Sequence, residues 1–273
     1  VGQHQLDVYG EVMDSLHLAR HAGLQGEEHV WGLQRSLVNY LEWCWDEPDE
    51  GLWEVRGPRQ QFVHSKVMAW TGLQRMIELS WVAADRAVRM VEEFGKEGPV
   101  ERWRALRDTI HAEVCEYGFD RQRNTFTQYY GSKELDAALL LIPEVGFLPY
   151  DDPRVVGTIE AVREELMDDG FVVRYHTAGD DSIDGLPGQE GAFLACSFWL
   201  ANALLCIGRR EEAEELFHRL LALRNDVGLL AEEYDPRAKR QVGNFPQAFS
   251  HVPLVTTALN LAHKDNLRRA EQE

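Results

Sequence analysis

Apolar residues recur every three or four positions along most of the chain, which is the period of an amphipathic α-helix. No stretch alternates convincingly between apolar and polar residues, as a half-buried strand would. The pattern therefore predicts an all-α fold. Nine helices are expected, over residues 6–21, 27–45, 65–94 with a break, 100–117, 132–142, 153–167, 189–207, 210–223 and 245–263.

The predicted helices are of two kinds. "GAFLACSFWLANALLCIG", residues 191–208, is apolar or small on nearly every side, whereas "RREEAEELFHRLLALR", residues 209–224, has one apolar stripe and a charged back. Alternation of buried and half-exposed helices predicts two concentric layers. An α-solenoid would need a repeated motif, which the hairpins lack. A double ring of helical hairpins, forming one domain over residues 1–273, is therefore favoured.

The composition is that of a globular protein with an acidic surface. The 273 residues carry a formal net charge of -18, and the acids are spread along the helices rather than gathered in a tail. Nucleic acids and anionic membranes are therefore poor partners. The four cysteines lack metal-site spacing and are expected to be buried free thiols, and the histidines show no HExxH pair. Neither a metal nor a cofactor is expected.

The N-terminal residues bear on location. No apolar run is long enough to cross a bilayer, and "VGQHQLDVYG" lacks the basic-then-apolar order of a signal peptide. A cytoplasmic location is therefore expected, although an already processed N-terminus would look the same.

Long polar connections lead into the buried helices. Long polar loops in a compact domain are usually functional, and loops that meet at one end of a ring form one pocket. These connections span residues 46–64, 118–131, 170–188 and 224–244.

Two of these connections carry acids beside aromatic residues. Glu54 directly follows Trp53, while Glu232 and Glu233 precede Tyr234. A carboxyl group packed against an indole loses hydration, which raises its pKa and lets it act as an acid near neutral pH. A second carboxylate in a more polar setting stays ionised and can act as a base. For any single loop glutamate, an N-cap, a surface salt bridge or plain solvation is the alternative.

Four long segments carry a resemblance to one enzyme family. They are "GLWEVRGPRQQFVHSKVMAW", "YYGSKELDAALLLIPEVGFLPYDDPRV", "DGLPGQEGAFLACSFWLANAL" and "AEEYDPRAKRQVGNFPQAFSHVPLV". Together, from about Leu6 to Ala262, the chain resembles the catalytic domain of glycoside hydrolase family 15, the glucoamylase family. The resemblance implies an (α/α)6 barrel and inverting hydrolysis of α-glucosidic bonds.

The resemblance also assigns roles. Glu54 takes the place of the family's general acid, directly after the tryptophan of its LWE motif, and Glu232 takes the place of its general base, with Glu233 as the neighbour. In an inverting glycosidase the acid protonates the leaving oxygen while the base activates water on the opposite face, with the two carboxyl groups about 6.5–9.5 Å apart. Two distant loops across a ring opening can supply this separation.

The sugar site is expected to use aromatic faces, which stack on pyranose C–H surfaces, and guanidinium groups, which hydrogen-bond paired hydroxyls. Arg174, in "VRYHT", matches an Arg-Tyr motif of the family, although pairing with a carboxylate is an equally good reading. Glu190, expected at the start of a buried helix, is assigned to the helix dipole. The candidate substrate-binding residues are Trp53, Arg56, Arg174, Tyr175 and Glu233.

One departure concerns the family's early helices, which carry an Arg-Asp pair that grips the terminal glucose. In this chain Arg107 with Asp108 comes after the loop that carries Glu54, so it does not match that pair. In the expected order of helices, the loops that carry Glu54 and Glu232 each come three helices earlier than in the family. This predicts an incomplete barrel without its first helices. Such a fragment is expected to associate with a second copy, or with a chain carrying the missing helices, and to have little activity alone. Its exposed edge would carry Phe249, Val252, Val255 and Leu259.

Several functions remain open at the level of the residues. Exo-hydrolysis of α-glucans and hydrolysis of trehalose are not separated, so the expected substrate is an oligosaccharide or a disaccharide. A non-catalytic helical scaffold or carbohydrate-binding fragment would need neither an acid nor a base, and the presence of Glu54 and Glu232 argues against it. Phosphorolysis would replace the base carboxylate with a phosphate site, which makes it the least favoured.

Overall fold

The computed structural model describes residues 2–24, 28–94, 99–176, 183 and 190–262. The chain divides into two compact units. Unit 1 comprises Val1–Phe119, Gln128–Ser132 and Glu144–Phe147, and unit 2 comprises Asp120–Thr127, Lys133–Pro143 and Leu148–Glu273. Each unit is described by itself, and the single barrel domain expected from the sequence stays a prediction.

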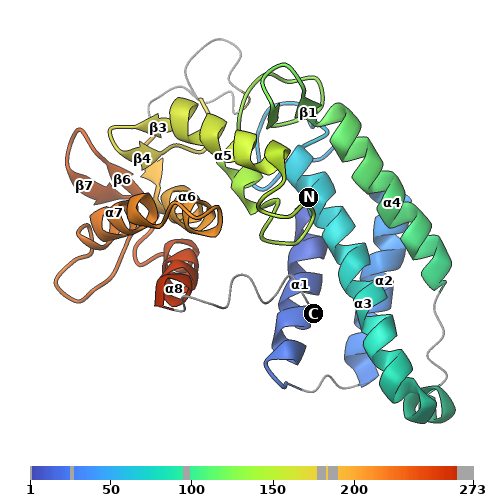
Figure 1. The fold of residues 1–273 in the computed structure, drawn as a ribbon. Coiled ribbons are helices and arrows are strands. Elements are labelled where there is room, and N and C mark those ends of the chain that lie inside the picture. The colour runs from blue at the N-terminus through green and yellow to red at the C-terminus, as the bar shows by residue number, and fades with distance from the viewer. Residues whose placement is uncertain (1, 25–27, 95–98, 177–182, 184–189, 263–273) are drawn as a thin grey trace. The chain divides into compact units, whose positions relative to one another are not determined.

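Unit 1 is built around one long helix. Helix α3 (Val63–Phe94) packs against α1 (Asp7–His21), α2 (Glu28–Cys44) and α4 (Val100–Tyr117) (Figure 1). The contact between α1 and α3 is close because α1 presents a glycine there: a Cβ on Gly10 would lie 2.0 Å from the carbonyl oxygen of Met68. The core of unit 1 includes Met13, Leu41, Val67, Leu73, Trp103 and Ile110.

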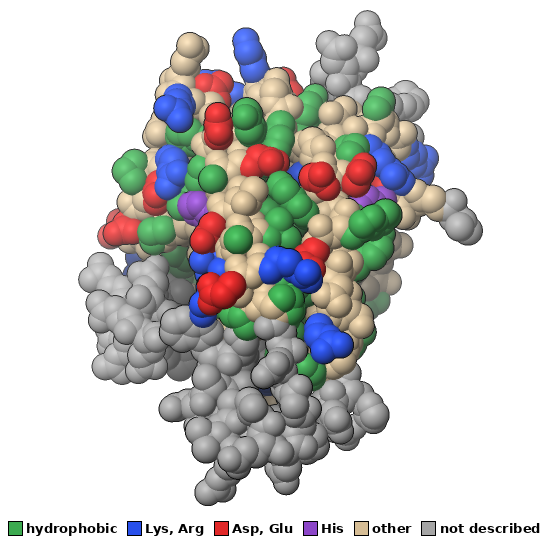
Figure 2. Space-filling model, turned by 90° about the vertical axis from the view of Figure 1, so that its right-hand side faces the viewer, with side chains coloured by type: hydrophobic (Ala, Val, Ile, Leu, Met, Phe, Trp, Pro, Cys, Tyr) green, Lys and Arg blue, Asp and Glu red, His purple; other side chains and the backbone are tan. Residues whose placement is uncertain are grey.

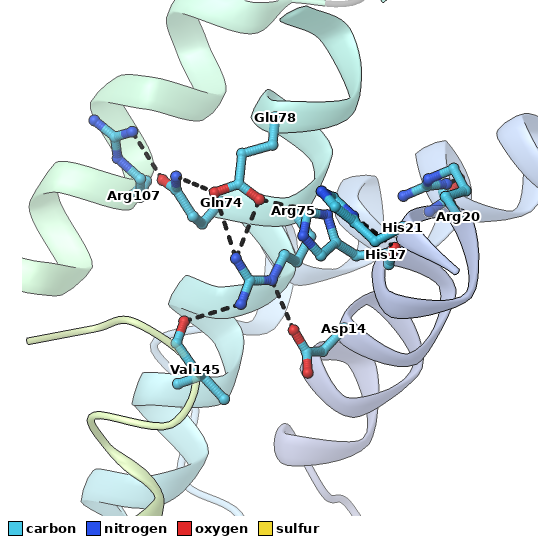
Figure 3. Close-up of polar contacts among 10 residues, drawn as sticks. Asp14, His17, Arg20, His21, Gln74, Arg75, Glu78, Arg107 and Val145 are labelled. Carbon is cyan, nitrogen blue, oxygen red and sulfur yellow. Dashed lines mark hydrogen bonds and ion pairs between the residues drawn. The ribbon is translucent and has the colours of Figure 1, made fainter. Parts of the chain in front are cut away.

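A polar network joins the helices of unit 1 around the Arg75 side chain, which is 14% exposed (Figure 3). Its guanidinium donates to Asp14 of α1 at 2.7 Å, to Glu78 of α3 at 3.1 Å and to the carbonyl oxygen of Val145 at 3.1 Å. Gln74 extends the network, since it donates to Glu78 and accepts from Arg107 of α4. One cation therefore ties two helices to the segment at residues 144–147.

Unit 2 is built around a helix that is buried on every side. Helix α6 (Leu194–Cys206) contacts the 3-10 helix η1 (Ala137–Leu141) and the helices α5 (Pro153–Glu165), α7 (Arg210–Leu221) and α8 (Ala248–Ala262). Every residue of α6 from Leu194 to Leu205 is buried. Helices α5 and α7 each bury one face, as their amphipathic sequences predict.

Seven short strands accompany the helices among the described residues, which corrects the expectation that the chain forms none. Each has two or three residues, too few for an alternating pattern to show in the sequence. Strands β1 and β2 pair, β3 pairs with β4, and β5, β6 and β7 form one sheet. The strands are β1 (Phe119–Asp120), β2 (Thr125–Phe126), β3 (Met167–Asp168), β4 (Phe171–Val172), β5 (Ala192–Phe193), β6 (Glu233–Asp235) and β7 (Arg240–Val242).

Three predicted helices differ from the observed ones. The helix expected over 132–142 is wrong except for η1, because Asp136 is extended and caps Ala138 while Pro143 cannot continue a helix. The helix expected from residue 189 begins at Leu194, since the two residues before it form β5. The break expected within 65–94 is also wrong, because α3 is one continuous helix.

Helix α8 departs from the expectation of a fully buried helix. Of its residues only Ser250 and Thr257 are buried. Four apolar side chains on α8 are 38% to 65% exposed and are called the α8 stripe: Phe249, Val252, Val255 and Leu259. These are the residues that the sequence analysis expected to be exposed, whereas the edge of an incomplete barrel to which it assigned them stays a prediction.

The surface of the described residues mixes charges of both signs. Figure 2 shows acidic and basic side chains interspersed over the described part of one face of the molecule. Among the residues that the structure describes, no helix has both the length and the apolar composition that a membrane span requires.

The Arg75 network generates a prediction about stability. Replacement of Arg75 by alanine removes the donor to the Asp14 carboxylate and to the Val145 carbonyl and one of the donors to Glu78, so the free energy of unfolding should fall by about 2–4 kcal/mol. The matched control is Arg102→Ala, which removes an ion pair to Glu42 from an arginine that is 63% exposed and should cost about 0–1 kcal/mol. Chemical denaturation measures both, and equal losses would contradict the assignment.

Candidate active site

The loop between α2 and α3, residues 45–62, carries the predicted acid and is held at its base by backbone pairing. Asp49 and Gln60 exchange two hydrogen bonds of 3.0 Å, so the loop closes on itself. The buried Lys66 donates to the carbonyl oxygens of Trp45 and Glu47. A buried cation thus fixes the position at which the chain leaves α2.

Glu54 sits at the turn of this loop. Its φ angle is 54°, in the left-handed region, and its N–H donates to the carbonyl oxygen of Gly51 at 3.1 Å. Val55, the next residue, is buried, and its N–H donates to Glu50 at 3.0 Å. The turn therefore leaves Glu54 exposed, with Trp53 half-buried beside it. The indole packing expected against the Glu54 carboxyl stays a prediction.

Two carboxyl groups at the base of the acid loop, residues 45–62, are buried: Asp49 belongs to the loop and Asp7 to α1. Asp49 is fully buried and accepts the N–H of Leu6 at 3.0 Å, which ties the loop to the start of α1. Asp7 is 1% exposed, and one of its oxygens, Oδ1, has no hydrogen-bond partner. Burial, with help from the charges of Glu11 and Asp49, raises the pKa of Asp7 from its ordinary 3.8 to about 7. Burial raises the pKa of Asp49 as well.

In unit 2 the backbone of Glu232 is held from both sides. Its N–H donates to the carbonyl oxygen of Asn244 at 2.9 Å, and its own carbonyl accepts the N–H of Leu194, the first residue of α6, at 3.0 Å. Glu232 directly precedes β6, whose Glu233 pairs with Phe193 of β5 and with Val242 of β7. The predicted base therefore lies directly before the middle strand of a three-stranded sheet, next to the start of the buried helix α6.

The side chain of Glu232 accepts three hydrogen bonds. Asn244 donates its backbone N–H and its side-chain Nδ2 to Oε2, each at 3.1 Å, and Gln247 donates Nε2 to Oε1 at 3.2 Å. An ionised carboxylate is acceptor-only, so this donor set is compatible with the role of base predicted for Glu232. Asn244 and Gln247 were missed as site residues by the sequence analysis, although both lie in the quoted "GNFPQAF" stretch.

Glu233 has a different environment from its neighbour. Its Oε2 accepts the N–H of Gly191 at 2.9 Å, and a Cβ on Gly191 would come 2.9 Å from the same oxygen. Burial raises the pKa of Glu233, and the charges of Glu190 and Glu232 raise it further, while the Gly191 hydrogen bond and Arg174 oppose them. Two adjacent glutamates thus face distinct surroundings.

Arg174 is 8% exposed and forms an ion pair with Glu190 through two of its nitrogens, one of them Nε at 3.2 Å from Oε2. Its guanidinium lies 5.0 Å from the ring centre of Tyr175 and 4.5 Å from that of Phe193. Pairing with a carboxylate, the alternative left open for Arg174, is therefore what the structure shows. The assignment of Glu190 to a helix dipole is wrong, because β5 separates it from the start of α6.

The structure groups the candidates by unit. Unit 2 brings Arg174 and Tyr175 close to Glu233 and its neighbour Glu232, around β5 and β6. Unit 1 holds the other group, Trp53, Glu54 and Arg56, with Arg56 exposed. Because each unit is described by itself, the separation of the acid and base carboxyl groups stays a prediction.

Metal ligands are not clustered in the described parts of the chain. There, histidine, cysteine, aspartate and glutamate side chains form no group of three or more that could hold a metal ion. The four cysteines are present as thiols, of which Cys44 and Cys196 are buried while Cys115 and Cys206 are only partly so.

The fold is of the (α/α)6 class, built from helical hairpins. A bacterial glucoamylase solved in complex with acarbose matches this chain with a TM-score of 0.71 and 12% identity, over 95% of this chain and 41% of that one. The chain itself belongs to glycosyl hydrolases family 15, whose family model matches residues 1–259.

Two curated relatives of this chain are named trehalase. A trehalase of Mycobacterium tuberculosis is 42% identical over 99% of this chain and 37% of its own length. A trehalase of Thermoplasma volcanium is 37% identical over 96% of this chain and 40% of its own. The chain thus spans about two fifths of the length of these relatives.

The buried pair under the acid loop predicts a pH dependence of stability. Because the pKa of Asp7 is raised in the folded protein, the folded state binds more protons than the unfolded state between about pH 4 and 7, and stability falls as the pH rises through that window. Asp7→Asn should therefore stabilise the protein at pH 8 by about 2–4 kcal/mol and have little effect near pH 4.

Denaturant melts at both pH values measure this difference. The control is Glu101→Gln, since the Glu101 side chain is 85% exposed, and it should leave the profile unchanged. An Asp7→Asn protein with the same stability as the wild type at pH 8 would show that Asp7 bears no buried charge.

Proposed function

We propose that this protein hydrolyses α-glucosidic bonds with inversion of the anomeric centre, with Glu54 as general acid and Glu232 as general base. The observation that carries the proposal is the match to family 15 over residues 1–259, which contains both loops. The donor set around Glu232 supports it, because a carboxylate held as an acceptor is suited to take a proton from water.

The chemistry follows from two opposed carboxyl groups. Glu54 gives its proton to the glycosidic oxygen as the bond from that oxygen to C1 breaks, and the bonding electrons leave with the oxygen. A water molecule attacks C1 from the opposite face and passes a proton to Glu232. General acid and general base assistance each contribute about 10²–10⁴-fold to the rate.

Sugar binding is assigned to residues of both units. The ion pair of Arg174 with Glu190 supports a role in which the guanidinium forms a rigid charged wall of the sugar site. Tyr175 is 2% exposed, which favours support of Arg174 over direct contact with sugar. Glu233 remains a pocket candidate, and Trp53 with Arg56 supplies the aromatic face and the second guanidinium from the acid loop.

Trehalose is the substrate that the relatives favour. The two curated relatives at 42% and 37% identity are both named trehalase, whereas the glucoamylase is similar at 12% identity and supports the fold alone. Exo-hydrolysis of α-glucans is the second choice. The comparisons offer nothing in favour of a non-catalytic fragment.

The proposal is tested with trehalose, maltose, isomaltose and longer α-glucans, with the anomers of the first glucose released read by NMR. Inversion of trehalose must give equal amounts of α- and β-glucose, because only the attacked C1 inverts while the leaving glucose keeps its α configuration. A glucan should release β-glucose first. Release of α-glucose alone from trehalose would overturn inversion.

The two assigned residues form the second arm of this experiment. In the full-length protein, Glu54→Gln and Glu232→Gln should each lower turnover by about 10²–10⁴-fold with the fold intact. The exposed Glu101→Gln, matched in chemistry, should keep the wild-type rate. A rate close to wild type in either loop variant would exclude that residue.

We also propose that the α8 stripe is an association surface, covered by a second copy of the chain or by helices of another segment. Its four apolar side chains, 38% to 65% exposed, support this. Light scattering should show association that increases with protein concentration and is lost in Val252→Lys. A monomer at every concentration would contradict association of copies.

A cytoplasmic location is proposed from the four thiols, since reducing compartments keep thiols reduced.

A further inference from the structure

We infer that Asn244 and Gln247 are positioning residues that aim one oxygen of Glu232, Oε1, at the attacking water. The inference rests on the proposed function, because it concerns the base of that reaction. It starts from the segment at residues 243–251, called the cradle segment, which runs from the end of β7 through the first turn of α8.

The cradle segment is fixed to Leu230 and Ala231, the two residues before Glu232, by contacts that do not involve the Glu232 side chain. Ser250 donates its hydroxyl to the carbonyl oxygen of Ala231 at 2.8 Å. The N–H of Gln247 donates to the carbonyl oxygen of Leu230 at 3.1 Å, and the N–H of Leu230 donates to Nε2 of His251 at 3.2 Å. The two side-chain amides are therefore presented from a backbone that is already anchored.

Gly243 lets the base lie directly on this backbone. Its φ angle is 78°, which favours glycine, and a Cβ there would come 2.8 Å from Oε2 and 3.0 Å from Cβ of Glu232. The carboxylate is thus packed against a residue without a side chain. Its rotamer is limited on one side by the cradle backbone and on the other by the amide donors.

The donors divide unequally between the two oxygens of Glu232. Oε2 receives two of them, the backbone N–H and the Nδ2 of Asn244, while Oε1 receives only Nε2 of Gln247. A carboxylate has about four acceptor positions, two on each oxygen. These three donors leave one position, and it is on Oε1. The water that attacks C1 should therefore donate to Oε1, and that oxygen should receive its proton.

Each amide can be removed without loss of the backbone anchors. Gln247→Met keeps the length of the side chain and the backbone N–H but deletes the donor to Oε1. Asn244→Ala deletes Nδ2 and keeps the backbone N–H to Oε2. The control is Asn260→Ala in α8, because the Asn260 amide donates to Asn202 at 2.7 Å and lies about two turns beyond the cradle segment.

Kinetics with the substrate turned over by the wild type give the first test. Gln247→Met and Asn244→Ala should lower kcat roughly 10-fold to 10²-fold, because small errors in aim are costly, and KM should change little. Loss of a donor to the carboxylate favours its protonated form, so the acidic limb of the pH–rate profile should move to higher pH. Asn260→Ala should retain both the rate and the profile.

A double-mutant cycle separates positioning from general support of the fold. If Gln247 acts through Glu232, Gln247→Met should have no further effect on the residual rate of Glu232→Gln. A second loss of the same size in that background would overturn the inference, since the amide would then act elsewhere. An unchanged pH–rate profile in Gln247→Met would also overturn the inference.

A titration that needs no turnover distinguishes this inference from the proposed function. Glutamate labelled with ¹³C at the carboxyl carbon reports Glu232 by NMR, its signal being identified by its loss in Glu232→Gln. The titration midpoint should rise in Gln247→Met and stay in place in Asn260→Ala. A midpoint that does not rise would overturn the positioning role of Gln247. A raised midpoint in a protein that hydrolyses no α-glucoside would support that role and overturn the proposed hydrolase function.

Discussion

Two backbone hydrogen bonds at Glu232 join three segments of unit 2 around the candidate base. One joins the Glu232 N–H to the carbonyl oxygen of Asn244, and the other joins the Glu232 carbonyl to the N–H of Leu194. The first links Glu232 to the residues that precede α8, and the second links it to the first turn of α6. A buried polar backbone left without these partners would cost stability, so the pairing is enforced by the burial of α6 itself.

The acids of the candidate site differ because the surroundings of each differ. Glu232 has three N–H donors and is only half-buried, whereas Glu233, one residue later, has its pKa raised by burial beside a second carboxylate. Arg174 pairs with Glu190, and its guanidinium lies 5.0 Å from the ring centre of Tyr175 and 4.5 Å from that of Phe193. Two carboxyl groups that are adjacent in the chain therefore have different hydrogen-bond partners and different neighbouring charges.

In unit 1 two buried charged side chains hold the acid loop, residues 45–62, in place. Asp49 reaches the backbone at the start of α1, and Lys66 reaches the carbonyl oxygens at the end of α2, both from buried positions. These contacts fix the N-terminal end of the loop, and the backbone pairing of Asp49 with Gln60 joins the C-terminal end to it, while the turn at Glu54 is exposed. Rigid ends with an exposed tip are what a loop needs to present one carboxyl group to a substrate.

The sequence by itself determined where most helices lie, because apolar spacing acts within a few residues: α4 begins and ends where its pattern predicts. It also identified Glu232 and Arg174 as residues of interest, since their motifs are local. Tertiary structure decided the rest. The strand at 192–193 forms only because β6, some forty residues later, pairs with it, and no local pattern could show that. The partners of Arg174 and Glu232 were likewise decided by chain segments brought together in folding, since a hydrogen bond depends on distance in space and the sequence records only distance along the chain.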